Sequence, residues 1–108
     1  MVCTITEFPM KHTLENQTLT LYFGGEINSY NADEIEKEVD RIVSSASFSS
    51  VKADLSEVSY VSSAGLRIFA RIRQRCDDVT LVNVQDVVYD VLEMVGFSNL
   101  MHIEKKKD

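Results

Sequence analysis

The fold of this chain is decided by residues 54–75, which read DLSEVSYVSSAGLRIFARIRQR. This stretch passes from a strand pattern through a serine turn directly into a helix pattern, and it places Ser63 at the helix start. Free backbone N–H groups and the positive end of the helix dipole both favour a negative charge there. We therefore predict that Ser63 is phosphorylated and that the chain is a switch. The alternative is that one serine simply caps the helix while Gly65 allows close packing.

The helix after Ser63 has a broad apolar face and a narrow basic side. Arg67, Arg71 and Arg75 recur every four residues as a basic stripe, and Arg67 lies one turn after Ser63. Either Arg67 holds a phosphate on Ser63 with two hydrogen bonds, or the whole stripe docks on an acidic partner. A solvated helix face explains the spacing as well, because arginine is a good helix former. The apolar face consists of Gly65, Leu66, Ile68, Phe69, Ala70, Ile72 and Cys76.

Two strands are predicted upstream of residue 25. Leu19, Leu21 and Phe23 alternate with polar residues ahead of two glycines, a pattern typical of a half-buried strand that ends at a flexible turn. Residues 2–8 are rich in β-forming residues. We expect them to pair with the first strand as an antiparallel edge, across a turn near residues 10–16.

From Asn31 the apolar period changes to that of a helix, with acidic residues in the first turns. The serine-rich residues 44–50 are expected to end this helix as a loop. Val51, Ala53 and Leu55 then alternate as the next strand, and apolar residues continue through the turn that follows. The apolar face of the helix contains Ala32, Ile35, Val39, Ile42, Val43 and Ala46.

Downstream, residues 79–84 form a third main strand pattern, and Asp86 is expected to cap a last helix that ends at Gly96. Residues 100–103 predict a short edge strand. Alternating strands and helices indicate one α/β domain over residues 1–108, with right-handed crossovers that pack helices against a sheet. The positions of the last helix expected to face the core are Val87, Val88, Val91, Leu92 and Val95.

The composition restricts the partners. The chain has 108 residues, 44% of them hydrophobic, and a formal net charge of −6. Such a charge disfavours nucleic acid or an anionic membrane as a partner, because both attract cationic surfaces. The sequence contains neither a signal-peptide pattern nor an apolar run long enough to span a bilayer, so we expect a cytoplasmic location. Cys3 and Cys76 are expected to be free thiols.

The residues also argue against an enzyme. A serine nucleophile would need an oriented base, and the only histidines, His12 and His102, lie in peripheral segments. No metal site or cofactor site is predicted, since the acids are not joined by a Cys/His cluster and no phosphate-binding loop motif is present. The tyrosines are scattered, and we interpret them as residues at the edge of the core: Tyr22, Tyr30, Tyr60 and Tyr89.

Three segments together resemble a known family, the bacterial anti-sigma factor antagonists of the STAS domain group. They are residues 25–28 (GEIN), residues 54–66 (DLSEVSYVSSAGL) and residues 91–97 (VLEMVGF). The central segment is the specific one, and the outer two gain weight from their order and spacing. The resemblance implies a STAS-like mixed sheet of four to five strands, with helices packed mainly on one face.

The resemblance also implies a mechanism. In that family an anti-sigma factor that is a serine kinase phosphorylates the serine at the position of Ser63, and a serine phosphatase of the PP2C type reverses the mark. The unphosphorylated form binds the anti-sigma factor and frees the sigma factor. The oligomeric state is left open. The positions expected to contact the partner are Asn28, Ser62, Ser63, Ala64, Gly65, Arg67 and Arg71.

The chain departs from the family pattern at four positions. Ser62 stands where aspartate is usual, Ala64 where serine or threonine is usual, Arg67 where glycine is common and Asn28 where aspartate is frequent. These changes make the site more positive than is usual in the family. They also give weight to a second interpretation, a constitutive STAS interaction module of a transporter or a stress-signalling assembly that is not phosphorylated.

Overall fold

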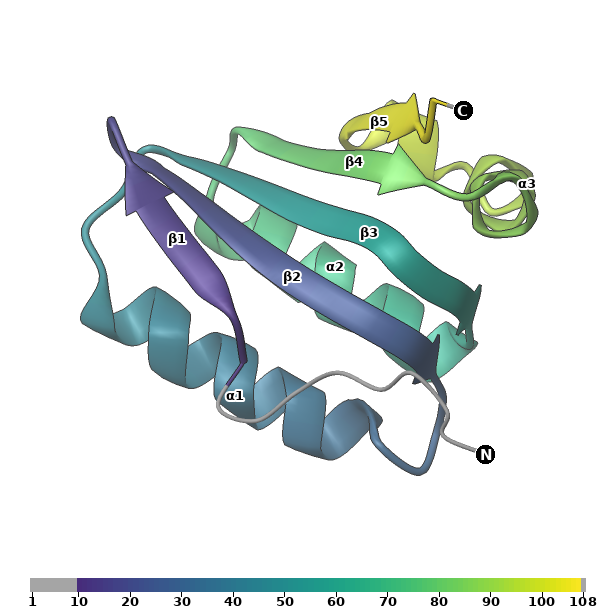
Figure 1. Cartoon of the computed structure of the whole chain (residues 1–108), viewed down its shortest axis with the longest axis horizontal. Helices are drawn as coiled ribbons and strands as arrows, with labels where there is room; N and C mark the ends of the chain where they lie inside the picture. The colour runs from purple at the N-terminus through teal and green to yellow at the C-terminus, as the bar shows by residue number, and fades with distance from the viewer. Residues whose placement is uncertain (1–9, 108) are drawn as a thin grey trace.

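The computed structural model describes residues 10–107, which form one five-stranded sheet with helices against it (Figure 1). The strands lie in the order β1-β2-β3-β4-β5, with β1 antiparallel to β2 and all other neighbours parallel. The mixed sheet predicted from the sequence is therefore confirmed. The elements are β1 (His12–Glu15), β2 (Thr18–Ile27), α1 (Ala32–Ser45), β3 (Ser50–Val61), α2 (Ser63–Arg75), β4 (Val79–Val84), α3 (Asp86–Met94), the 3-10 helix η1 (Phe97–Asn99) and β5 (His102–Lys105).

The antiparallel edge is formed by a different segment from the one expected. Residues 2–8 lie outside the described residues, and β1 pairs with β2 instead, across the two-residue turn Asn16-Gln17. Both turn residues have positive φ, 50° and 69°, as the twist of a tight hairpin requires. The predicted turn over residues 10–16 is therefore wrong, because most of that segment is the edge strand itself.

The glycine pair after Phe23 does not end β2. The strand continues to Ile27, and β3 likewise continues to Val61, where the sequence pattern had suggested a turn. The register between β2 and β3 shifts twice in this region, and Gly25 has a φ of 67°. Because bulges allow irregular pairing, both strands extend through segments in which the apolar and polar residues do not alternate. The extension carries the two strands to a common carboxyl edge.

Helices α1 and α2 pack side by side on one face of the sheet (Figure 1). Their apolar positions are buried largely as the periodicity predicts, and Phe23 of β2 contacts Phe69 of α2 in an edge-to-face arrangement with ring centroids 5.4 Å apart. None of the helices within residues 10–107 combines the length and the apolar character needed to cross a bilayer.

Helix α3 is buried less than its five apolar positions predicted. Val88 and Leu92 are buried against the sheet, whereas Val87 and Val95 are more than half exposed. A short helix at the margin of a sheet can bury only a narrow stripe, so the remaining valines stay in solvent. Asp86 is the first residue of the helix and does not cap it; the position before it is Gln85. The last strand, β5, begins at His102, two residues later than expected.

Candidate phosphorylation site and partner surface

Ser62 is the residue that caps α2. Its Oγ accepts a hydrogen bond from the backbone N–H of Gly65 at 3.3 Å, and its carbonyl accepts the N–H of Leu66 at 2.9 Å. Its own N–H donates to the carbonyl of Ile27 at 2.8 Å, so the cap is joined to the end of β2. The capping role considered as the alternative for the serine pair is therefore confirmed for Ser62, and Ser63 is the first residue of the helix that it caps.

Ser63 is the first residue of α2 and is exposed at the carboxyl edge of the parallel strands. Its side chain makes no hydrogen bond within residues 10–107. The first turn of α2 contains no acidic residue, so nothing in this turn compensates the positive end of its dipole. A hydroxyl at this position is open to a foreign active site, and the helix end favours a phosphate attached to it.

Gly65 fixes how closely α2 approaches the sheet. A Cβ atom at this position would lie 2.7 Å from Cγ2 of Ile27 and 2.8 Å from Cγ1 of Val61, well inside van der Waals contact. Ala64, on the same turn, is partly buried against the core. The close packing predicted for Gly65 is confirmed. It brings the start of α2 directly against the ends of β2 and β3 and thereby positions Ser63.

Asn28 lies next to this site, because it follows Ile27 at the end of β2. Its Oδ1 accepts the N–H groups of Tyr30 at 2.9 Å and Asn31 at 3.2 Å. In return, Oδ1 of Asn31 accepts the N–H of Asn28 at 2.9 Å, and Nδ2 of Asn31 donates to the carbonyl of Glu26 at 2.8 Å. The structure gives Asn28 the role of shaping the loop before α1.

The basic stripe of α2 is paired with acids of α1 and does not form a free positive surface. Nε of Arg71 lies 2.7 Å from Oε2 of Glu36, and Arg75 lies 3.3 Å from Asp40. Arg67 is held most loosely, 4.0 Å from Oδ1 of Asp33. Sequence alone missed this ladder, since its paired residues are 34 or 35 positions apart. Arg67, the member nearest Ser63, is the one most available for a phosphate.

The prediction that Tyr30 lies at the edge of the core is wrong. Its side chain is 93% exposed, and that of Tyr60, near the end of β3, is 50% exposed. A signal was present in the sequence, because Tyr30 falls in the run Asn28-Ser-Tyr-Asn31, ahead of the helical period. Tyr22 and Tyr89 are partly buried, as expected.

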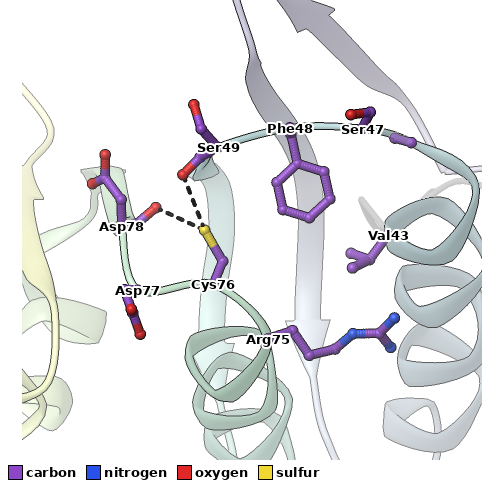
Figure 2. Close-up of a pocket in the computed structure, with 9 residues that line it drawn as sticks. Val43, Ser47, Phe48, Ser49, Arg75, Cys76, Asp77 and Asp78 are labelled. Atoms are coloured by element: carbon purple, nitrogen blue, oxygen red, sulfur yellow. Dashed lines mark hydrogen bonds between the residues drawn. The ribbon is translucent and has the colours of Figure 1, made fainter.

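One pocket lies at the carboxyl ends of α1 and α2 (Figure 2), whereas Ser63 lies at the start of α2. It has a volume of about 540 Å³ and is lined by the loop after α1 and by the end of α2. Sγ of Cys76 is 3.4 Å from the carbonyl oxygen of Ser49 and 3.5 Å from that of Asp78, so the thiol closes the helix end onto this loop. Arg75 extends toward α1, where it donates to Ser44. The pocket is therefore separate from the candidate phosphorylation site at Ser63.

Comparison with known proteins agrees with this geometry. The family model of the STAS domain matches residues 9–108. An anti-sigma-B factor antagonist of Listeria monocytogenes is 29% identical over 90 residues, which are 80% of this chain and 78% of that protein.

Two solved structures share the fold. An anti-sigma factor antagonist from Mycobacterium paratuberculosis superposes with a TM-score of 0.78 at 17% identity, covering 88% of this chain and 83% of that one. The Bacillus cell fate determinant SpoIIAA in its phosphorylated form superposes with a TM-score of 0.65 at 12% identity, covering 87% and 89%. The chain thus belongs to the STAS domain family, and within that family it is similar to anti-sigma factor antagonists.

Proposed function

We propose that this chain is a cytoplasmic anti-sigma factor antagonist that phosphorylation at Ser63 switches off. Unphosphorylated, it binds an anti-sigma factor that is a serine kinase, and the bound anti-sigma factor releases its sigma factor. A PP2C-type phosphatase removes the phosphate and restores binding. The observation that carries the proposal is the exposed, unbonded hydroxyl of Ser63 at a helix end whose first turn contains no acid.

The chain is a regulator and not an enzyme, in line with its relationship to the anti-sigma factor antagonists. In the proposal, the kinase and the phosphatase are the catalysts, and this chain supplies the hydroxyl that they modify. The partner surface comprises the predicted positions around that hydroxyl. Asn28 and Gly65 contribute by shaping it, and Arg67 contributes charge.

The switch follows from electrostatics. Phosphoserine adds about −1.5 to −2 charges at neutral pH. Covering these charges with a surface fitted to a neutral hydroxyl costs desolvation and repulsion. About 2.8 kcal/mol is enough to weaken binding a hundredfold, so no change of fold is required. In the free protein the start of α2 favours the phosphate, and Arg67 can turn from Asp33 to meet it.

The test is calorimetric binding to each purified anti-sigma factor kinase of the organism that makes this chain. Ser63→Ala should bind like the wild type, and Ser63→Asp should bind at least tenfold more weakly. Ser47→Asp is the matched control, because Ser47 is exposed and lies in the loop after α1, beside the end of α2 (Figure 2), whereas Ser63 lies at its start. Equal binding by Ser63→Ala and Ser63→Asp would contradict the electrostatic account.

Modification in the native cell distinguishes the switch from a constitutive module. Mass spectrometry should find the peptide that contains residues 62 and 63 phosphorylated at Ser63 under some growth conditions. A Ser63 that stays unmodified under all conditions would favour the alternative, a STAS module that holds a transporter or stress-signalling assembly together.

A further inference from the structure

Tyr30 is the most exposed large hydrophobic side chain within residues 10–107. Single exposed apolar residues are common and need no special explanation. Tyr30 differs because its ring is almost entirely in solvent and its loop is rigid. An aromatic side chain of this kind forfeits about 1.5–3 kcal/mol of burial free energy that a partner could recover.

The loop that carries Tyr30 is held by its own hydrogen bonds. Four of them connect the side chains of Asn28 and Asn31 to loop and strand backbone, and in one of these Oδ1 of Asn28 accepts the N–H of Tyr30 itself. The carbonyl of Asn28 also accepts the N–H of Ala32 at 2.9 Å, which fixes the loop to α1. A preordered loop presents the ring at little further cost in conformational entropy.

The loop lies beside the phosphorylation site. Ile27, which precedes it, pairs with Val61 at the end of β3 and accepts the N–H of Ser62. Figure 1 shows the ends of β2 and β3 and the start of α2 meeting at one edge of the molecule. Tyr60 faces this region from β3, opposite Glu26. A kinase that covers Ser63 therefore has to pass over or contact the neighbouring loop.

Exposed carboxylates lie on the strands and the helix that flank this loop. Glu26 and Glu57 lie on the strand ends, and Asp33 and Glu34 lie in the first turn of α1. A second copy of this chain would bring acid against acid at this edge. Charge complementarity instead favours a protein partner with an apolar, ring-sized pocket and a cationic rim.

We propose that Tyr30 is the anchor of the complex with the anti-sigma factor, inserting its ring into such a pocket, and that Tyr60 packs beside it. This inference rests on the proposed function, since it assigns the same partner a specific point of attachment. Tyrosine is enriched among residues that dominate binding energy, especially where the ring is rigidly presented. The phosphate on Ser63 then acts next to the anchor and weakens the same contact.

The experiment measures binding of the same purified anti-sigma factor kinases to five variants. Tyr30→Ala should weaken binding about thirtyfold or more, and Tyr60→Ala about tenfold. Tyr30→Phe should stay within about threefold of the wild type, because it keeps the ring. The control is Met94→Ala, at an 83% exposed position near the end of α3, which should bind within about twofold. Ser63→Asp reports on the switch, and melting curves should be unchanged for Tyr30→Ala.

The outcomes separate the anchor from the switch. Equal binding by Tyr30→Ala and the wild type, together with weakened binding by Ser63→Asp, would overturn the anchor and leave the proposed function intact. Weak binding by Tyr30→Ala with normal binding by Ser63→Asp would support the anchor and overturn the switch. A loss confined to Met94→Ala would move the partner site to α3, and failure of every kinase to bind the wild type would overturn both proposals.

Discussion

The starts of α1 and α2 meet at the same edge of the sheet, yet they are built in opposite ways. Helix α1 follows a loop held by Asn28 and Asn31 and contains Asp33 and Glu34 in its first turn. Helix α2 has only the hydroxyl of Ser62 as its cap and no acid in its first turn. One helix dipole is compensated by residues of the chain itself. The other has no acidic residue in its first turn, and this difference supports the proposal that Ser63 is the regulated position.

The position of the start of α2 depends most on its close contact with the sheet at Gly65, and a substitution at this residue can break that contact. Gly65→Ala places a Cβ within 2.8 Å of two core side chains, so it should lower the free energy of unfolding by about 1–3 kcal/mol despite the better helix propensity of alanine. Urea denaturation measures this loss. Gln74→Ala, at an exposed position of the same helix, is the control and should be nearly neutral.

The loop that precedes α1 can be destabilised by a substitution at Asn28. Asn28→Ala removes the acceptor for two backbone N–H groups and should cost about 1–2 kcal/mol. Asn28→Asp keeps that acceptor and should stay close to the wild type. Thermal melts of both variants check this. If the aspartate variant were as unstable as the alanine variant, the loop would depend on some feature other than the acceptor oxygen.

Glu38 is an acid of α1 that is held by its own hydrogen bonds. A bidentate contact with Arg41, and then the backbone N–H of Met10, lower the pKa of the Glu38 carboxyl from 4.5 to about 2. A lowered pKa contributes stability above pH 4.5 that is lost as the pH falls toward 2. Because Arg41 is exposed, solvent screens the ion pair, and we expect it to contribute only about 1 kcal/mol to the free energy of unfolding. Unfolding of Glu38→Gln should depend less on pH than that of the wild type between pH 5 and pH 2.

The smallest expected change in stability comes from charges placed in the first turns of α1 and α2, where they interact with the helix dipoles. Ser63→Asp should stabilise the free protein by about 0.3–1 kcal/mol, because it adds an acid where α2 has none. Asp33→Asn should destabilise it by a similar amount. Both changes should shrink in high salt. If Ser63→Asp destabilised the free protein, the start of α2 would not be the open charge site that the comparison describes.

Most of the sheet and both long helices could be predicted from local periodicity, since Leu19 to Phe23, the helix over residues 32–45 and the strand over residues 79–84 have clear patterns. Strand β1 could not. Its four residues are all exposed and have no apolar alternation, so pairing with β2 alone defines it. The extensions of β2 and β3 were missed because glycines and serines interrupt the pattern there.

The candidate site was predictable as far as it rests on local sequence. The serine turn and the close packing of Gly65 follow from the transition between residues 54 and 75. The acidic partners of the arginine stripe and the exposure of Tyr30 did not follow, because they depend on how α1 and its preceding loop lie against α2. Sequence separation hides such contacts from a periodicity argument.

The outer strands of the sheet have a consequence for association between copies of this chain. Both β1 and β5 are only four residues long, and β5 is followed directly by lysines. Short edge strands with lysines nearby are poor templates for the addition of a strand from another molecule. Crowding this protein should therefore not join sheets into larger ones, and any higher-order array would have to form through loops or helices.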